Sequence, residues 1–130
     1  MPRYRRGWAI SQQASEQELL SPLMGSLIEP ALLILLKKKP QHGYNLIDNL
    51  GTLGLGTPHP SVVYRILRDM EILQWIHSQW DAEETQGPPR RIYTLTPQGE
   101  DALQSWLTEM QKAGELIKIL SLKTDEGKEL

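Results

Sequence analysis

The sequence has no cysteine, no strong excess of charge of either sign and no long hydrophobic run. The lack of cysteine excludes a disulfide-built secreted scaffold, Cys-ligated zinc, an iron–sulfur cluster and thiol catalysis. The apolar run over residues 31–36 is far too short to span a bilayer, and the N-terminal arginines are not followed by a signal-peptide pattern. We therefore expect a cytoplasmic protein that makes no contact with a membrane.

The length and the charge distribution narrow the class further. The 130 residues, 39% of them hydrophobic and 23% charged, suit one globular domain. The net charge of −2 argues against a protein that coats nucleic acid through bulk basicity. However, residues 1–80 carry eight Lys or Arg against six Asp or Glu, whereas residues 81–130 carry six against ten. A local basic patch is therefore compatible with the overall acidity.

The N-terminal part, residues 1–26, is predicted to be an arm with one short helix. Residues 1–14 show no clear periodicity. Ser15 and Glu18 have the spacing of a capping box, which predicts a helix that ends near Gly25.

Residues 27–96 have the pattern of three helices and a hairpin. The helix that contains residues 31–38 is apolar nearly all round, so we expect it in the core or against a second subunit. Further helices are predicted over residues 43–53 and 60–73. Two strand-like runs, residues 75–81 and 90–95, are joined by a polar link with Gly-Pro-Pro, which predicts a hairpin with a long tip.

A long final helix is predicted over residues 97–122, with a flexible tail at 123–130. Thr96-Pro97 is a favourable helix start. Apolar residues then recur with alternating spacings of three and four, the pattern of a coiled-coil seam. We interpret this helix as a homodimer interface, in preference to a helix packed only on its own core. The predicted interface residues are Leu103, Trp106, Met110, Ala113, Ile117 and Leu120.

Together these elements predict a mainly α fold with a small β-hairpin wing: a winged helix-turn-helix followed by a long C-terminal dimerisation helix. In this arrangement the third helix enters the major groove of DNA. Three motifs strengthen the interpretation: Gly43-Tyr44 after an apolar helix, Tyr64-Arg65-Ile66-Leu67-Arg68 with Met70-Glu71 on the third helix, and the run from Gly87 to Gly99. Over about residues 28–107 the chain closely resembles the PadR-like transcriptional regulators. The family usually has glycine between the third helix and the wing, where this chain has Gln74.

The candidate DNA-binding residues lie on the second and third helices and at the wing. Arg65 and Arg68 are one turn apart on the polar face of the third helix, and arginine suits bidentate contact with guanine or phosphate. Arg90 and Arg91 point to opposite faces of their strand, so one is expected to reach DNA while the other pairs with Asp81, Glu83 or Glu84. The full predicted set is Tyr44, His59, Ser61, Tyr64, Arg65, Arg68, Arg90 and Arg91. For Tyr64 we favour a packing role with its hydroxyl at the surface.

The resemblance implies a homodimeric regulator, most simply a repressor, whose partners are double-stranded operator DNA and a second copy of itself. It also suggests that a small aromatic effector binds near Trp106 and Met110 at the dimer interface. Trp106 could equally be a packed anchor of that interface, which would leave no pocket. The three histidines share no metal-ligand spacing and no catalytic motif is present, so neither a cofactor, a metal nor an enzyme activity is expected. The alternative is a protein-interaction module that reuses the winged-helix and coiled-coil dimer without binding DNA.

Overall fold

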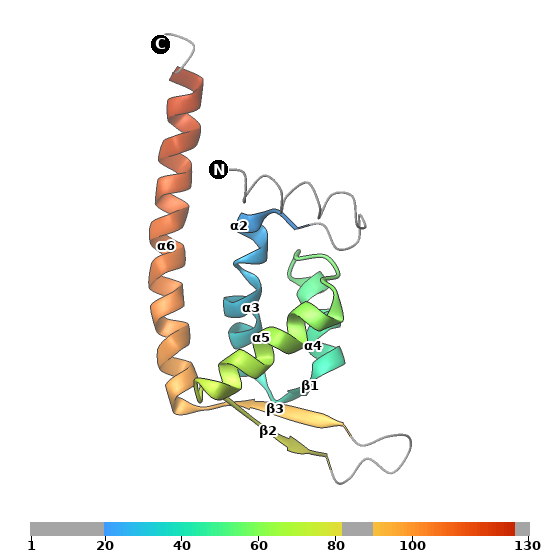
Figure 1. Cartoon of the computed structure of the whole chain (residues 1–130). Coiled ribbons are helices and arrows are strands. Elements are labelled where there is room, and N and C mark those ends of the chain that lie inside the picture. Colours follow the sequence, from blue (N-terminus) through green and yellow to red (C-terminus); the bar gives the residue numbers. More distant parts are fainter. Residues whose placement is uncertain (1–19, 82–89, 127–130) are drawn as a thin grey trace.

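The computed structural model describes residues 20–81 and 90–126 and shows a helical body, a small sheet and a long C-terminal helix (Figure 1). Residues 1–19, which include most of the predicted arm at 1–26 and the Ser15–Glu18 capping box, lie outside the described residues. So do Glu83 and Glu84, and the last four residues of the predicted tail.

Two consecutive helices begin the described chain. The first, α2, comprises Pro22–Gly25, and the side chain of Ser21 accepts a hydrogen bond from the backbone N–H of Met24 at 3.1 Å. A helix therefore ends at Gly25, as predicted, but it begins at Pro22, and the predicted start at Ser15 lies outside the described residues. The second, α3, comprises Ile28–Lys38 and is buried along most of its length, as its apolar sequence predicts. It lies in the core of its own chain (Figure 1).

The next two helices form the helix-turn-helix. They are α4, Gly43–Thr52, and α5, Pro60–Ile72. The turn between them contains Gly54 and Gly56, which adopt φ angles of 99° and 70° that favour glycine. On α5, Val63, Leu67 and Met70 are fully buried, so this helix is anchored through one face only. Both helices agree with the predicted ranges to within one residue.

The sheet has three strands, and the sequence predicted two. The strands are β1, Gln41–His42; β2, Ile76–Trp80; and β3, Arg91–Leu95, in the antiparallel order β1-β3-β2. The wing consists of β2, β3 and the link between them. β1 joins the inner edge of the wing, with Gln41 opposite Tyr93 and His42 opposite Ile92. This short strand ties the start of α4 to the root of the wing.

The turn between α5 and the wing places Gln74 in a left-handed conformation, with a φ of 66°. The backbone N–H of the next residue, Trp75, donates to the carbonyl of Met70 at 2.9 Å, as in a helix C-terminus closed by a left-handed residue. A glycine would adopt this conformation without the steric cost of a side chain.

The C-terminal helix α6 comprises Pro97–Glu126. Thr96 caps it, because its Oγ1 accepts from the N–H of Gly99 at 3.0 Å and donates to the carbonyl of Gln74 at 2.6 Å. The helix extends beyond the predicted end at residue 122, which corrects the proposed boundary of the flexible tail. None of the helices in the described residues is long and apolar enough to cross a membrane.

The first turns of α6 pack on α3 and complete the core (Figure 1). Leu103 is only 4% exposed and belongs to this core. The prediction that Leu103 lies in a dimer seam is therefore corrected, because α3 of the same chain already covers it. Beyond Met110 the helix leaves the body, and Leu116, Ile117 and Leu120 are about half exposed in the single chain.

Candidate nucleic-acid interface

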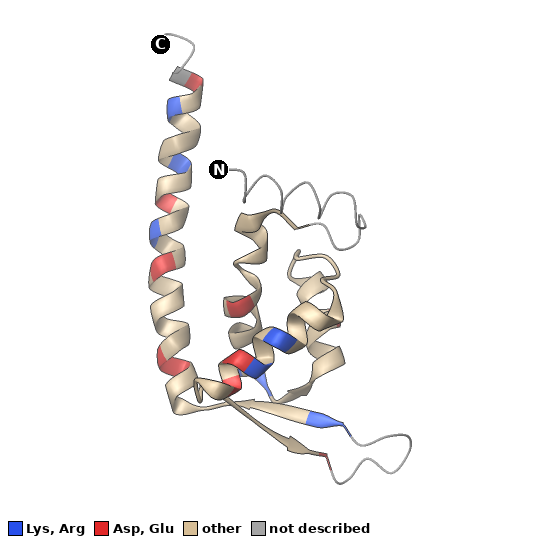
Figure 2. Ribbon diagram, viewed as in Figure 1, with Lys and Arg blue, Asp and Glu red and all other residues tan. Residues whose placement is uncertain are grey.

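The outer face of α5 carries two arginines. Arg65 and Arg68 are both exposed there, one turn apart, as predicted. Figure 2 shows basic positions beside acidic ones on α5, a basic position at the start of β3, and acidic and basic positions mixed along α6. Since the opposite face of α5 supplies Val63, Leu67 and Met70 to the core, the arginines are directed away from the body.

The N-terminus of α5 is capped by His59. Its Nδ1 accepts a hydrogen bond from the backbone N–H of Ser61 at 3.1 Å and lies 2.7 Å from the Ser61 hydroxyl. The cap satisfies one of the N–H groups that a helix start leaves without an intrahelical partner. Both residues are exposed and stand at the positive end of the helix dipole, where an anion is favoured.

A groove of about 530 Å³ lies between α5, the start of α4 and the wing; we call it the wing groove. The structure thereby brings together residues that are far apart in the sequence. Its lining includes three arginines and three tyrosines, together with residues 42 and 43: Arg68, Arg90, Arg91, Tyr44, Tyr64 and Tyr93.

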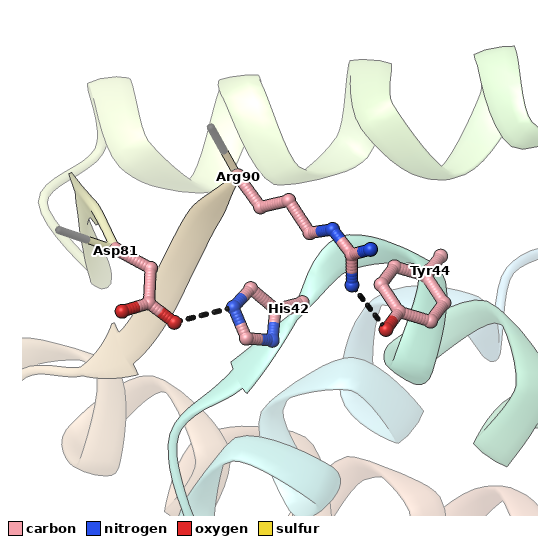
Figure 3. A network of polar contacts seen from close by, with 4 residues as sticks. All are labelled: His42, Tyr44, Asp81 and Arg90. Atoms are coloured by element: carbon pink, nitrogen blue, oxygen red, sulfur yellow. Dashed lines mark hydrogen bonds and ion pairs between the residues drawn. The ribbon is translucent and has the colours of Figure 1, made fainter. Parts of the chain in front are cut away.

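Arg90 is held at one side of the wing groove by Tyr44. The guanidinium donates a hydrogen bond to the Tyr44 hydroxyl and lies 4.8 Å from the centre of the tyrosine ring (Figure 3). Beside this pair, His42 Nε2 lies 3.0 Å from Asp81 Oδ2 (Figure 3). The two contacts connect the start of α4 with the outer end of the wing strands. Tyr44 is 46% exposed, so its side chain can contact a ligand while it keeps its contact with Arg90.

Arg91 is held in a different way. Its Nη1 donates to the hydroxyl of Ser78 at 2.9 Å, and that hydroxyl donates to Oε2 of Glu71 at 2.7 Å. The guanidinium also lies 4.6 Å from the centre of the Trp80 ring. These partners were not among those predicted for the wing arginines, because Ser78 and Trp80 carry no charge that a sequence pattern would match.

Tyr64 and Tyr93 have packing roles. The ring of Tyr64 covers Gly43 so closely that a Cβ at position 43 would lie 2.5 Å from it, which explains the need for glycine there. This agrees with the packing role favoured for Tyr64, which remains 43% exposed. Tyr93 is buried, and burial raises its pKa, with further contributions from the negative charges of Tyr64 and Glu71 and an opposing one from Arg91.

The residues predicted to hold an effector do not lie in one pocket. Trp106 is half-buried on the core, and its indole N–H donates to Oε2 of Glu29 on α3 at 2.7 Å. It lines a cavity of about 410 Å³ with Trp75 and the acidic residues Asp101 and Glu109. Met110 is not part of that lining. The indole therefore packs in its own chain and also lines a cavity, whereas the anchor interpretation placed it in a dimer interface without a pocket.

A helix-turn-helix followed by a two-stranded wing, with an exposed arginine-bearing face on the second of the two helices, defines the class of winged-helix proteins. The family model described as "Transcriptional regulator PadR-like family" matches residues 32–105, more than half of the chain. The chain belongs to this family and is a transcriptional regulator. The resemblance inferred from the motifs is thus confirmed.

Solved structures share the fold. A PadR-like transcription factor from Bacteroides fragilis is 26% identical, with 77% of this chain and 95% of that chain covered and a TM-score of 0.63. Bacillus subtilis PadR in complex with operator DNA is 25% identical, with 62% and 46% covered and a TM-score of 0.56. A PadR family regulator from Clostridium difficile, 23% identical over 71% and 95%, shows the same fold with a TM-score of 0.61. No curated protein matches the chain.

Proposed function

We propose that this regulator represses transcription as a homodimer that binds operator DNA, with α5 in the major groove and the wing on the phosphate backbone. Membership of the PadR-like family supports this proposal, and so does the similarity to a Bacillus subtilis relative whose structure contains operator DNA. A net charge of −2 does not oppose it, because four arginines, Arg65, Arg68, Arg90 and Arg91, still lie on α5 and at the wing.

The observation that carries the DNA proposal is the division of α5 into two faces. One face is fully buried, while Arg65 and Arg68 extend from the other. Arginine at successive turns of an exposed helix can donate two hydrogen bonds to guanine O6 and N7 or to a phosphate. The wing groove adds three further cationic or hydrogen-bonding groups next to this helix, at Arg90, Arg91 and Tyr44.

The dimer proposal depends on the distal part of α6. With Leu103 and Trp106 covered by their own chain, the apolar residues left for a partner begin at Met110 and include Ile117 and Leu120, which are 47% and 56% exposed. Such side chains gain free energy when a second helix covers them. A dimer would also place two α5 helices on one DNA duplex, one for each half-site.

The test of the DNA proposal starts with an operator selected from a random-sequence duplex library. Arg65→Ala, Arg68→Ala and the control Lys112→Ala, an exposed change on α6, are compared on that operator and on a scrambled duplex at matched salt. We expect Arg65→Ala to cost about 1–3 kcal/mol on the operator and much less on scrambled DNA. We expect Arg68→Ala, as a phosphate contact, to weaken both duplexes about equally.

Two results would contradict the DNA proposal. The wild-type chain could select no duplex at all, which would favour the protein-interaction alternative. It could also bind well while neither arginine variant loses affinity, which would remove α5 from the recognition surface.

The dimer proposal is tested by replacing Met110 and Ile117 together with glutamate. Two charges in an apolar seam should yield monomers in sedimentation analysis, and the fold should persist because both positions lie outside the core cluster. A double variant that sediments as a stable dimer would show that α6 does not hold the two copies together.

We propose that an aromatic effector binds in the cavity beside Trp106, within one chain, and not between Trp106 and Met110 at the dimer interface. Two tryptophans and two carboxylates line this space, which suits a flat aromatic molecule, above all a cationic one. Titration with planar aromatic compounds should quench tryptophan emission more in the wild type than in Trp106→Leu, in which Trp75 is the only tryptophan that remains in the lining. Equal quenching in both proteins would contradict this location.

A further inference from the structure

Trp80 is the most exposed aromatic side chain among the large hydrophobic residues of the described chain. It is the last residue of β2 and is 58% exposed, and its cross-strand neighbour is Arg91 of β3. The Arg91 guanidinium lies 4.6 Å from the centre of the indole ring. An exposed indole costs free energy in water, and its position beside a fixed cation is unexplained by the packing of the chain.

The position of Trp80 on the wing shows which way the ring faces. Side chains two residues apart on a strand share a face, so Trp80 lies on the same face of β2 as Ser78. Ser78 is buried and donates to Glu71 of α5, which means that this face is turned toward α5. Trp80 therefore continues the α5-facing side of the wing outward, about 7 Å beyond the point where α5 covers it.

The surroundings of Trp80 have the chemistry of a nucleic-acid backbone site. Arg91 is restrained by Ser78 and by the indole, and both Arg68 and Arg91 line the wing groove. A guanidinium that uses one N–H on Ser78 still has donors for a phosphate. The part of the ring that the guanidinium leaves exposed is apolar and matches the deoxyribose that links one phosphate to the next.

We propose that Trp80 is a DNA-contacting residue: its indole packs on a deoxyribose of the backbone while Arg91 binds the adjacent phosphate. This inference rests on the proposed DNA-binding function and assigns the wing a contact that does not depend on base sequence. The DNA backbone, rather than a protein, is the occupant because the ring lies against Arg91, which itself lines the wing groove together with Arg68 and Arg90. Covering the ring removes apolar surface from water without adding a charge contact.

The experiment compares Trp80→Ala, Arg91→Ala and Gln79→Ala by fluorescence anisotropy on the selected operator and on a mixed-sequence duplex, over a series of salt concentrations. Gln79 is the matched control, since it is exposed on the opposite face of the same strand. We expect Trp80→Ala to weaken binding about tenfold on both duplexes with an unchanged salt slope. Arg91→Ala should lower the slope by about one unit, and Gln79→Ala should behave as the wild type.

Trp80→Phe provides a second readout that does not depend on the alanine variant folding. If DNA covers the indole, the change in tryptophan emission on adding the mixed-sequence duplex should be large in the wild type and mostly lost in Trp80→Phe. Circular dichroism of each variant verifies the fold.

Each other result overturns the inference. Unchanged affinity and emission at Trp80, with normal wild-type binding, would leave the ring without a DNA contact. A reduced salt slope for Trp80→Ala, equal to that of Arg91→Ala, would mean that Trp80 only positions the arginine. A loss confined to the operator would indicate base readout. Failure of the wild type to bind any duplex would instead refute the proposed function on which the inference rests.

Discussion

The assignment of Leu103 to the core, and of Ile117 to the surface of the single chain, gives a paired prediction. Leu103→Ala should lower the free energy of unfolding by about 2–5 kcal/mol, the range for a leucine truncated in a well-packed core, because the residue is 4% exposed. Ile117→Ala removes a side chain that is 47% exposed, so it should lower the stability of the single chain by less than about 1 kcal/mol. Its main effect should be on dimerisation.

Urea unfolding at several protein concentrations separates the two effects. For Leu103→Ala the midpoint should fall by a similar amount at every concentration, because the loss is within one chain. For Ile117→Ala it should fall mainly at concentrations where the wild type is a dimer, since a bound partner stabilises the folded state by mass action. The assignment would be refuted if Leu103→Ala left the low-concentration midpoint unchanged, or if Ile117→Ala lowered the free energy of unfolding at low concentration by more than about 2 kcal/mol.

Three smaller predictions follow from single contacts. Gln74→Gly should raise the free energy of unfolding by about 1 kcal/mol in thermal or urea unfolding, because glycine adopts the left-handed φ of 66° without side-chain strain; a loss of stability would contradict this. The pKa of Tyr93 is raised in the folded state, mainly by burial, so the unfolded chain loses the proton first and wild-type stability should fall as the pH rises above the ordinary value of 10.0; Tyr93→Phe should lack this fall, and parallel pH curves would refute it. Tyr44→Phe removes the hydrogen bond to Arg90 and keeps the ring beneath the guanidinium, so it should weaken DNA binding less than Arg90→Ala; additivity in a double-mutant cycle of the two would show that they act separately.

Most of the helical framework could be predicted because each helix has its own periodicity and clear end signals. The glycines and prolines between α4 and α5 mark the end of α4 and the start of α5, and Thr96-Pro97 marks the start of α6. By contrast, β1 could not be predicted, since two residues carry no alternation. Gln41 and His42 become a strand only because the distant residues Tyr93 and Ile92 lie opposite them.

The role of the seam on α6 shows a limit of periodicity. A repeat of three and four identifies the face of a helix that is covered, but not what covers it. The first residues of the repeat, Leu103 and Trp106, are covered by α3 and Glu29 of the same chain. The later ones extend beyond the body. The apolar face of α6 is covered by its own chain up to about Met110 and is exposed beyond it. This boundary follows from the lengths of the two helices, because α6 is much longer than α3.

The arginines of the candidate interface fall into two groups that the sequence could not distinguish. Arg90 and Arg91 are each held by an aromatic ring and a hydroxyl group, whereas within residues 20–81 and 90–126 no hydrogen bond or ion pair restrains Arg65 or Arg68. A restrained arginine loses little side-chain entropy on binding and presents its charge at a fixed place, which suits a backbone phosphate of regular geometry. An unrestrained arginine can adjust to the base edges that it meets. It loses side-chain entropy on binding, and only well-formed hydrogen bonds to the correct bases offset that loss. The wing is therefore expected to supply affinity that is common to all sequences, and α5 the difference between them.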